Sequence, residues 1–475
     1  MRTLETDVAV IGAGTAGLAA YRAVKSAGKR ALIVEGGPYG TTCARVGCMP
    51  SKLLVAPAEA LHGLERFAAF GFTLDAPPRV DGKAVMARVR RERDRFVGFV
   101  VEGVERLPAA DKVRGYARFV DDHTLMVGPA PDGAGSDTLI KAPRIVIATG
   151  SSPVYPAAWR ALGERLVVND DVFEWQDLPQ SVAVFGPGVI GLELGQALHR
   201  LGVRVKIFGR GGGVGPLADP QVLECARRLF GAELYLDTDA RAEVGRDGDA
   251  VVVTYRALDG STQSERFDYL LAATGRRPNV QGLDLANTSL AVDRFGVPLF
   301  DRTTMRAGQS SIFLAGDVDD DAPLLHEAAD EGRIAGTNAA HYPDVRPGLR
   351  RAGLGIVFTD PQIATVGGGY AAVRNVPHVT GAVSFEDQGR SRVMLRNRGL
   401  LHVYAEVGTG LFLGAEMIGP DAEHIGHLLA WARQMNLAIE QMLEMPFYHP
   451  VVQEGLRTAL RDAQAKLAAA QKQAA

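Results

Sequence analysis

Two cysteines near the N-terminus, in the segment TCARVGCMPSK, have a spacing that could support redox chemistry. Cys43 and Cys48 are five positions apart. On a regular helix this spacing gives about 7.5 Å of rise, which exceeds the roughly 7 Å between Cα atoms that a disulfide can bridge. A bridge would need a distorted backbone, which Gly47 permits before Cys48 and which Pro50 favours by interrupting helical bonding after it. Such a bridge is strained and easily reduced. The alternative is two unpaired, half-buried thiols, and the spacing alone does not decide between the two.

A second pair of residues, which could transfer a proton to or from a thiol, lies near the C-terminus in FYHPVVQEGL. His449 carries an imidazole that can accept a proton from a thiol near neutral pH, and Glu454 carries a carboxylate that can fix the tautomer of that imidazole. A single histidine before a proline is more often structural. A catalytic role for His449 and Glu454 is therefore supported only in combination with the other motifs of the chain.

The first glycine-rich loop predicts a dinucleotide-binding unit. An apolar strand, DVAVI, runs into GAGTAG, with Gly12, Gly14 and Gly17, and then into an alanine-rich helical stretch. Glycines permit the tight turn and let a diphosphate approach the N-terminus of the helix, where the unpaired N–H groups favour an anion. The next strand, ALIVE, ends at Glu35, where a ribose-binding carboxylate is expected. The alternative is a purely structural glycine turn.

A second such loop follows the strand VAVF and reads GPGVIG, with Gly186, Gly188 and Gly191. The offset that leads from Gly14 to Glu35 leads here from Gly188 to Gly209, which is followed by Arg210. No acid is therefore placed to bind a ribose hydroxyl, and an arginine lies where a 2′-phosphate could bind. The alternative, which the sequence leaves equally open, is that Arg210 points into solvent. Two loops imply two dinucleotides, one bound permanently and one exchanging, which indicates redox chemistry.

Three further strand ends carry small or acidic residues that could contact a cofactor. Apolar strands end at Thr149-Gly150, at Thr274-Gly275 and at Gly316-Asp317. A carboxylate at a strand tip, such as that of Asp317, can accept a hydroxyl hydrogen bond from a bound cofactor. The alternative for Asp317 is a helix N-cap.

Composition limits the remaining function classes. The 475 residues predict about three domains, and 47% hydrophobic residues are sufficient for packed cores. A net charge of −3 gives no electrostatic argument for nucleic acid, and the sequence contains no apolar run long enough to span a membrane. Three cysteines without a CxxC motif or a histidine cluster argue against a secretory disulfide framework and against a metal site. We expect a cytoplasmic protein.

Taken together, these residues resemble the flavin-dependent pyridine nucleotide–disulfide oxidoreductases, and within them the dihydrolipoamide dehydrogenases. The resemblance covers nearly the whole chain. It rests on GAGTAG with Glu35, TCARVGCMPSK, the two ATG turns, GPGVIGLE, AGD at Ala315–Asp317, FTDPQIATVG at Phe358–Gly367, and HP with Glu454.

The resemblance implies an α/β fold with two Rossmann-like dinucleotide-binding domains, a central domain and a C-terminal α+β interface domain for dimerisation. We expect an FAD-binding domain with the cysteine pair at 1–150 and an NAD(P)-binding domain at 151–276, the latter opening with a linker at 151–180. A central domain at 277–346 would complete the FAD site, and an interface domain at 347–475 would form a homodimer.

The resemblance also implies roles for individual residues. Cys43 would be the interchange thiol, Cys48 would lie nearer the flavin, and His449, oriented by Glu454, would reach the cysteines of the opposite subunit. Glu193 would pair with Lys52 near the reactive edge of the flavin. FAD would be held by Gly12, Gly14, Gly17, Glu35, Lys52, Thr149, Gly150, Gly316 and Asp317, and NAD or NADP by Gly186, Gly188, Val189 at the nicotinamide face, Gly191, Glu193, Arg210 and Gly275.

The expected reaction is oxidation of a dithiol, dihydrolipoamide, with a lipoyl domain of a ketoacid dehydrogenase complex as a candidate partner. Two departures leave the substrate open: Val451 replaces the threonine usual after HP, and Gly209 replaces the acid typical of NAD users. An NADPH-dependent reductase of the glutathione reductase type is the nearest rival. Mercuric reductases and large thioredoxin reductases fit less well because the tail AAAQKQAA has no cysteine pair, and a transhydrogenase would not need Cys43 and Cys48. A non-catalytic flavin-binding subunit is the alternative from another class.

Overall fold

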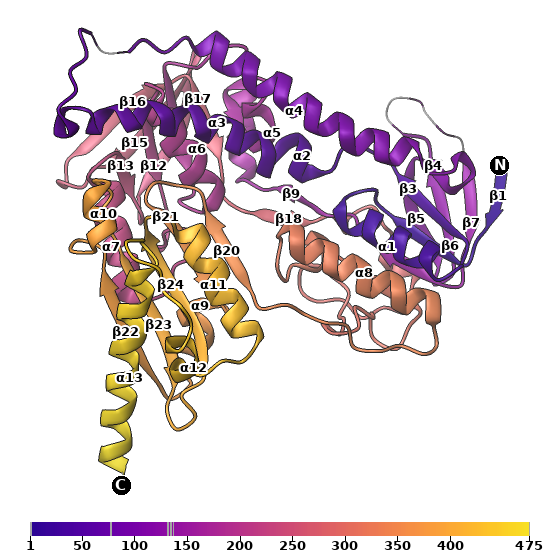
Figure 1. Ribbon diagram of the computed structural model, residues 1–475. Helices are drawn as coiled ribbons and strands as arrows, with labels where there is room; N and C mark the ends of the chain where they lie inside the picture. Colours follow the sequence, from indigo (N-terminus) through magenta and orange to yellow (C-terminus); the bar gives the residue numbers. More distant parts are fainter. Residues whose placement is uncertain (1, 77, 131–132, 134, 136, 475) are drawn as a thin grey trace. The chain divides into compact units, whose positions relative to one another are not determined.

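The computed structural model describes residues 2–76, 78–130, 133, 135 and 137–474. The chain forms two compact units, each built from three separate segments (Figure 1). The first unit comprises Met1–Pro50, Arg91–Val154 and Arg276–Arg351. The second comprises Ser51–Arg90, Tyr155–Gly275 and Ala352–Ala475.

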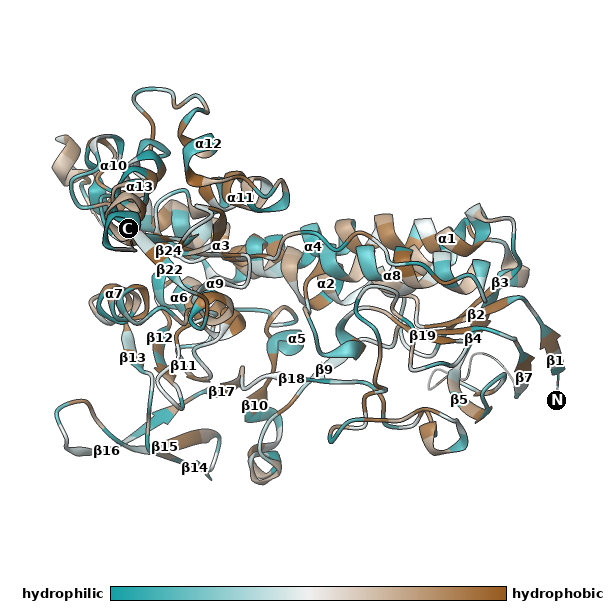
Figure 2. Ribbon diagram, turned by 90° about the horizontal axis from the view of Figure 1, so that it is seen from below, coloured by the Kyte–Doolittle hydropathy of each residue, from teal (hydrophilic) through white to brown (hydrophobic). Residues whose placement is uncertain are grey.

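The first unit is organised around a five-stranded parallel sheet. Its apolar strands are almost completely buried, which explains why they read as continuous hydrophobic runs in the sequence. Figure 2 shows strands of this sheet in the brown of hydrophobic residues. The strand order is β19 (Ile312–Leu314), β8 (Ile145–Ile147), β2 (Val8–Ile11), β3 (Ala31–Glu35) and β4 (Lys112–Arg114). A four-stranded sheet follows the order β1 (Arg2–Glu5), β7 (Thr138–Lys141), β6 (Thr124–Gly128) and β5 (Tyr116–Asp121). Two short strands, β9 (Ser151–Pro153) and β18 (Arg276–Pro278), pair antiparallel.

Helices α1 (Thr15–Ser26) and α8 (Leu325–His341) lie side by side in the first unit (Figure 1). A Cβ atom at Gly332 would lie 2.1 Å from the carbonyl oxygen of Ala16, and one at Gly336 would lie 2.3 Å from that of Ala20. Only glycine fits at these two contacts, so the two helix backbones approach each other directly. Helices α2 (Thr42–Val46), α3 (Cys48–His62) and α4 (Gly82–Glu105) come after α1 along the chain.

The second unit contains a parallel sheet of the same kind, with helices α6 (Val189–Arg200) and α7 (Pro220–Gly231). Its strand order is β10 (Leu166–Val167), β17 (Tyr269–Ala272), β11 (Ser181–Phe185), β12 (Arg204–Phe208) and β13 (Tyr235–Asp237). An antiparallel sheet of β14 (Ala242–Asp247), β15 (Ala250–Arg256) and β16 (Thr262–Phe267) accompanies it.

The C-terminal part of the second unit is a five-stranded antiparallel sheet with helices. Its order is β20 (Leu354–Val357), β21 (Gln362–Val366), β24 (Phe412–Gly419), β23 (Leu400–Glu406) and β22 (His378–Ser384). The helices are α9 (Gly369–Val373), α10 (Gly389–Val393), α11 (Ala422–Gln434), α12 (Ile439–Leu443) and α13 (Glu454–Ala474). Helix α13 packs on β22, where a Cβ atom at Gly381 would lie 2.2 Å from the carbonyl oxygen of Ala459.

The expected fold class is confirmed, with two parallel dinucleotide-type sheets and a C-terminal α+β part. The prediction that 151–180 is a linker is wrong, because this segment contributes β9, β10, a 3-10 helix at Ala157–Arg165 and α5 (Asn169–Val172). Strand β10 pairs with β17, a partner about a hundred residues away in the sequence that no local pattern reveals.

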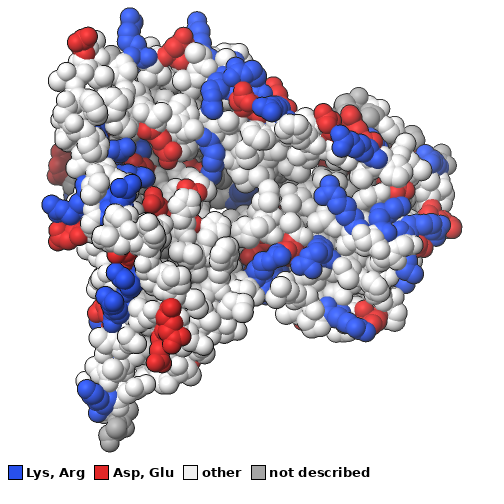
Figure 3. Space-filling model, viewed as in Figure 1, with Lys and Arg blue, Asp and Glu red and all other residues white. Residues whose placement is uncertain are grey.

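The surface charges and the composition of the helices agree with the expectations from the sequence, which shows no large charge imbalance and no apolar run long enough to span a membrane. On the face shown in Figure 3, cationic and anionic side chains are interspersed. None of the described helices is both long enough and apolar enough to cross a bilayer.

Candidate active site

The two cysteines lie on either side of a break between helices. Cys43 is half-buried in α2, and the exposed Cys48 begins α3. Gly47 between them has φ −128° and ψ −114°, and a Cβ atom there would lie 3.3 Å from the Cα of Cys43. The chain therefore turns back at Gly47, as the spacing argument required. The expectation for Pro50 is wrong: it is the third residue of α3, where its missing N–H costs no helical hydrogen bond, so α3 continues through it.

The first glycine loop is shaped by contacts that exclude any side chain. Gly12 has φ +107°, and a Cβ atom there would lie 2.2 Å from the carbonyl oxygen of Ala148. A Cβ atom at Gly17 would lie 1.9 Å from the carbonyl oxygen of Gly12. Gly14 instead faces open space as the N-cap of α1, whose first turn has no side-chain cap and no acidic residue. These N–H groups can bind one diphosphate group.

Glu35 is fixed beside this loop at the end of β3. Its Oε2 accepts a hydrogen bond from the backbone N–H of Ala13 (2.7 Å), and its Oε1 accepts one from that of Gly37 (2.7 Å). Each oxygen keeps a lone pair for a further donor. The carboxylate can therefore accept a ribose hydroxyl next to a bound diphosphate, so the donor and acceptor set of the first loop fits FAD.

The tips of β8 and β19 lie at the same carboxyl edge as the first glycine loop, because β19, β8 and β2 are neighbouring parallel strands. After β8, Thr149 Oγ1 donates to the carbonyl oxygen of Asn279 (2.7 Å), and Gly150 has φ +69°. After β19, Gly316 has φ +77°. Asp317 begins a short 3-10 helix, η6 (Asp317–Asp319), and its Oδ2 accepts a hydrogen bond from Ser151 Oγ (2.9 Å).

The second glycine loop repeats the first in the second unit. Gly186 has φ +109°, and its Cβ would lie 2.2 Å from the carbonyl oxygen of Ala273. A Cβ at Gly191 would lie 1.9 Å from the carbonyl oxygen of Gly186, whereas Gly188 faces open space as the uncapped N-cap of α6. Val189 follows it with 41% of its surface exposed, and the exposed Gly275, φ +120°, follows β17. This loop can bind a second diphosphate.

The structure explains the missing acid after β12. Gly209 is buried, and a Cβ atom there would lie 2.7 Å from Pro187 Cγ and 2.8 Å from the carbonyl oxygen of Thr238. An acidic side chain therefore does not fit without moving backbone. Arg210 is exposed, and it makes no hydrogen bond or ion pair with other residues in the described part of the chain.

Lys52 and Glu193 form the expected ion pair within the second unit. Lys52 Nζ lies 2.8 Å from Glu193 Oε2, and the glutamate is only 4% exposed. Glu193 Oε1 also accepts a hydrogen bond from the backbone N–H of Phe358 (2.9 Å), whose ring centre lies 4.4 Å from Nζ. Phe358 belongs to the FTDPQIATVG motif, but the sequence gave it no role, because neither a backbone donor nor a ring face can be recognised from the residue type.

His449 and Glu454 are hydrogen-bonded to each other. His449 Nδ1 lies 3.0 Å from Glu454 Oε2, and its side chain is 80% exposed. Glu454 begins α13, and its Oε1 also accepts a hydrogen bond from Arg457 (3.1 Å). The hydrogen bond from His449 lowers the pKa of Glu454, with help from Arg457. The ionised carboxylate therefore keeps the proton on Nδ1, which leaves Nε2 as the atom that can accept a proton.

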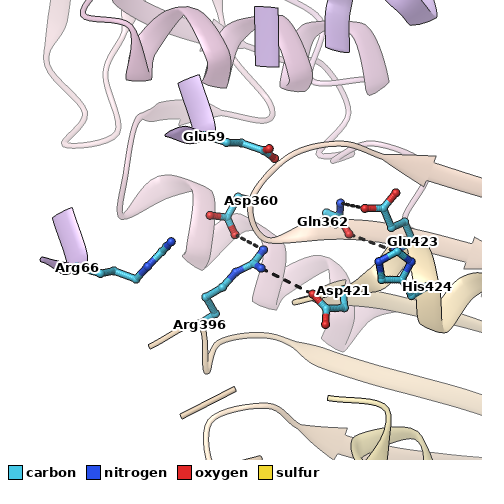
Figure 4. A pocket seen from close by; sticks show the side chains of 8 residues that line it. All are labelled: Glu59, Arg66, Asp360, Gln362, Arg396, Asp421, Glu423 and His424. Carbon is cyan, nitrogen blue, oxygen red and sulfur yellow. Dashed lines mark hydrogen bonds and ion pairs between the residues drawn. The ribbon is translucent and has the colours of Figure 1, made fainter. Parts of the chain in front are cut away.

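A separate cavity of about 340 Å³ in the second unit is lined by charged side chains (Figure 4). Arg396 lies between Asp360 and Asp421, at 3.7 Å from each carboxylate. Burial, together with the charge of Asp360, raises the pKa of Glu59. None of the residues predicted to carry the chemistry lines this cavity, whose walls are Glu59, Arg66, Asp360, Gln362, Arg396, Asp421, Glu423 and His424.

Comparisons with known proteins match almost the whole chain. A family model described as pyridine nucleotide-disulphide oxidoreductase matches residues 6–332, and its dimerisation domain matches residues 354–460. The chain is 31% identical over 468 residues to a dihydrolipoyl dehydrogenase of Haloferax volcanii, covering 96% of both chains. It is 29% identical over 466 residues to a mercuric reductase of Acidithiobacillus ferrooxidans, covering 96% of this chain and 82% of the relative.

Solved structures of low sequence identity share the fold. LpdA from Mycobacterium tuberculosis matches with a TM-score of 0.81 and 24% identity, over 97% of this chain and 99% of that one. The HOCl-induced flavoprotein disulfide reductase RclA from Escherichia coli, solved as a Cu(II) complex, matches with a TM-score of 0.80 and 21% identity, over 98% of this chain and 99% of that one.

Proposed function

Because the chain belongs to the pyridine nucleotide-disulphide oxidoreductase family, we propose that it is a dihydrolipoyl dehydrogenase that oxidises a dithiol through a Cys43–Cys48 disulfide. The observation that carries this proposal is the helix break at Gly47, which removes the regular spacing that would keep Cys43 and Cys48 apart. The hydrogen-bonded pair of His449 and Glu454 supplies a base for the thiol proton. Full-length similarity to dihydrolipoyl dehydrogenases supports the choice of substrate.

FAD would bind in the first unit, with its diphosphate at the uncapped N-terminus of α1 and ribose hydroxyls at Glu35. Thr149, Gly150, Gly316 and Asp317 would contact the cofactor at the neighbouring strand tips, and Lys52 would be oriented by Glu193. When bound, FAD would accept the electron pair of the reduced cysteines and deliver it as hydride to a nicotinamide. The nicotinamide coenzyme would bind at Gly186, Gly188, Val189, Gly191, Arg210 and Gly275.

Thiol–disulfide exchange is the step that the chain's own residues carry out. One substrate thiolate attacks Cys43 Sγ, the bond between the cysteines breaks, and Cys48 leaves as a thiolate. The second substrate thiol gives its proton to His449 Nε2 and attacks the substrate sulfur of the mixed disulfide, which releases the oxidised substrate and leaves Cys43 reduced. Because one substrate sulfur reacts as the thiolate and the other gives its proton to His449, the substrate loses two electrons and one proton in these steps, and both cysteines end as thiolates that hold the electron pair.

A homodimer would complete each active site. An apolar stripe on and just after α11 is exposed: Leu428 is 43%, Trp431 67% and Met435 70% exposed, at positions that share one helix face. Tyr448, next to His449, is 79% exposed. These side chains lie in or near the region that matches the dimerisation domain, so a second copy is the occupant that we assign to them. His449 would then face the cysteines of the opposite subunit.

An NADPH-dependent disulfide reductase is the second candidate, and the coenzyme site favours it. The packing around Gly209 excludes an acidic side chain, and the exposed Arg210 can pair with a 2′-phosphate.

Steady-state rates separate the dehydrogenase from the reductase. Dihydrolipoamide should be oxidised with NAD or NADP faster than glutathione disulfide or Hg(II) is reduced with NADH or NADPH. Turnover confined to glutathione disulfide or Hg(II) would contradict the dehydrogenase, and flavin binding without any of these reactions would indicate a non-catalytic subunit.

Coenzyme choice gives a direct test of Arg210. We expect Arg210→Ala to weaken NADP(H) use by about tenfold, the order of one lost exposed charge-assisted contact, while NAD(H) use changes little. The measurement is kcat/KM for both coenzymes. Arg160→Ala removes another exposed arginine of the same unit and should change neither value. Equal losses for both coenzymes in Arg210→Ala would show that Arg210 does not contact a 2′-phosphate.

A further inference from the structure

The side chain of Asp317, just after β19, is held by a single hydrogen bond from a neighbouring strand. Its Oδ2 accepts this bond from Ser151 Oγ on β9 (2.9 Å). Its Oδ1 has no hydrogen-bond partner among the residues that the structure describes. A carboxylate oxygen that lacks a donor can accept a hydroxyl group of a bound molecule. The contact with Ser151 therefore decides which of the two oxygens stays available.

Arg276, on the paired strand β18, fixes the direction of this hydrogen bond. Arg276 Nε donates to Ser151 Oγ (2.8 Å), and Arg276 Nη2 donates to the carbonyl oxygen of Ser151 (2.7 Å). A guanidinium group donates hydrogen bonds and cannot accept one, so the hydroxyl proton of Ser151 cannot be directed at Arg276. The proton is therefore donated to Asp317. Two bonds from one rigid, planar group also hold the serine in place.

Asn279, three residues further along the chain, holds the backbone around Ser151. The N–H of Asn279 donates to the carbonyl oxygen of Gly150 (2.9 Å), and its Nδ2 donates to that of Thr149 (3.0 Å). In return, Thr149 Oγ1 donates to the carbonyl oxygen of Asn279 (2.7 Å), and Ser152 Oγ donates to Asn279 Oδ1 (2.7 Å). The hydroxyl group of Ser151 therefore projects from a backbone that is fixed on both sides.

The positive charge of Arg276 acts on Asp317 through this hydroxyl group. Arg276 forms no ion pair with an acidic residue in the part of the chain that the structure describes. A donor that polarises a hydroxyl group strengthens the hydrogen bond that the hydroxyl group itself donates. The guanidinium group therefore strengthens the bond from Ser151 to Asp317.

We propose that Arg276 is a positioning residue for FAD, because it directs the proton of Ser151 onto Asp317 Oδ2 and so reserves Oδ1 for a hydroxyl group of the cofactor. This inference rests on the proposed function, which assigns Asp317 to FAD. The competing explanation is a purely structural role, in which Arg276 only braces the pairing of β9 with β18.

Substitutions of Arg276 separate the two roles by their hydrogen-bond chemistry. Arg276→Gln introduces a carbonyl oxygen that can accept the proton of Ser151, so this proton is no longer directed at Asp317. FAD should then leave the purified holoprotein about tenfold faster, the effect expected for one weakened hydrogen bond to a charged group. Arg276→Lys keeps a group that only donates, and it should restore most of the wild-type rate. The measurement is the rise of flavin fluorescence after dilution.

Two neighbouring residues on the same strands provide matched controls. Arg277 is exposed and makes no hydrogen bond or ion pair with the described residues, and the exposed Ser152 bonds to Asn279. Arg277→Gln and Ser152→Ala should release FAD at the wild-type rate. Ser151→Ala should release it about as fast as Arg276→Gln, and it keeps the proposal testable if Arg276→Gln does not fold.

A double-mutant cycle tests whether the effect of Arg276 passes through Asp317. Asp317→Ala alone should speed the release of FAD. Adding Arg276→Gln to Asp317→Ala should change the rate little further, because the hydrogen bond that Arg276 directs is already lost. Effects of the two substitutions that simply multiply would show that Arg276 acts only on the structure of the strands, and would overturn the proposal.

Crystal structures of the wild type and Arg276→Gln test the orientation of Asp317 without reference to FAD. The contact of 2.9 Å between Ser151 Oγ and Asp317 Oδ2 should persist in the wild type and be lost in Arg276→Gln. A contact that persists in the variant, wild-type release of FAD from Arg276→Gln and Ser151→Ala, or equal release from Arg276→Lys and Arg276→Gln would each contradict the directing role. A chain that purifies without flavin contradicts the proposed function, whereas the crystal structures still decide how Asp317 is positioned.

Discussion

Cys48→Ser is expected to abolish turnover of dithiol and disulfide substrates while FAD stays bound. The serine oxygen cannot form or break a disulfide, so the electron pair of the substrate has no path onward. FAD binding should persist, because the residues assigned to it are the glycine loop, Glu35 and the strand tips, which the substitution does not touch. The measurements are the flavin absorbance of the purified variant and steady-state rates with dihydrolipoamide.

Cys225→Ala is the matched control for the loss of a thiol. Cys225 is 9% exposed in α7, and burial raises the pKa of its thiol, so it is a poor nucleophile at neutral pH. We expect turnover close to that of the wild type. Normal turnover in Cys48→Ser would contradict the role of the cysteine pair, and loss of flavin in that variant would contradict the separation of cofactor binding from catalysis.

His449→Ala should lower turnover at neutral pH by about 10²–10⁴-fold, because the thiol proton loses its acceptor. Glu454→Gln should cost less, since the imidazole keeps its own basicity and loses only the orienting charge at 3.0 Å. Rates measured across pH separate the two variants from wild type. Lost proton transfer should be partly offset at high pH, where the substrate thiols ionise without help.

Mixing inactive chains tests whether His449 acts across a dimer interface. Co-refolded Cys43→Ser and His449→Ala chains should regain activity, because one site of each heterodimer then combines an intact cysteine pair with an intact histidine. Each variant refolded alone is the control and should stay inactive. Heterodimers that form and remain inactive would show either that the histidine acts within its own chain or that it is not the base.

The fold class and the positions of both glycine loops could be predicted from sequence because their determinants are local. Gly12 must lack a side chain because a Cβ atom would meet the carbonyl oxygen of Ala148, and Gly17 must lack one because it would meet that of Gly12. The same requirement explains why Gly186 and Gly191 have the same spacing. The position of Glu35 likewise depends on a local feature, the length of β3, which ends at this residue. His449 and Glu454 are five residues apart, so their hydrogen bond also lies within the reach of a short motif.

Contacts between distant segments could not be predicted from local patterns, and the pair of Lys52 and Glu193 was expected only from the family resemblance. Phe358 meets Lys52 through its ring face and Glu193 through its backbone, and Ser151 reaches Asp317 across 166 positions. Asp319 reads as one of three consecutive acids in a loop, and only the folded chain reveals that it is buried. The error at Pro50 has a local origin, since a proline breaks a helix or lies in its first turn depending on where the helix begins, and α3 begins at Cys48.

The near-identity of the two glycine loops has a consequence for residence time. In both loops, a Cβ atom on the first glycine would lie 2.2 Å from a carbonyl oxygen, and one on the third glycine would lie 1.9 Å from the carbonyl oxygen of the first. Both loops also leave the N-cap glycine in open space. The loops alone would therefore hold two diphosphates for equally long. On the proposed assignment, the difference between a cofactor that stays and one that leaves arises outside the loops. Glu35 and Asp317 add anchors in the first unit, whereas the second unit offers Gly209 in place of an acid. Transplanting an acid without relieving the crowding at Gly209 would therefore not convert an exchanging coenzyme into a resident one.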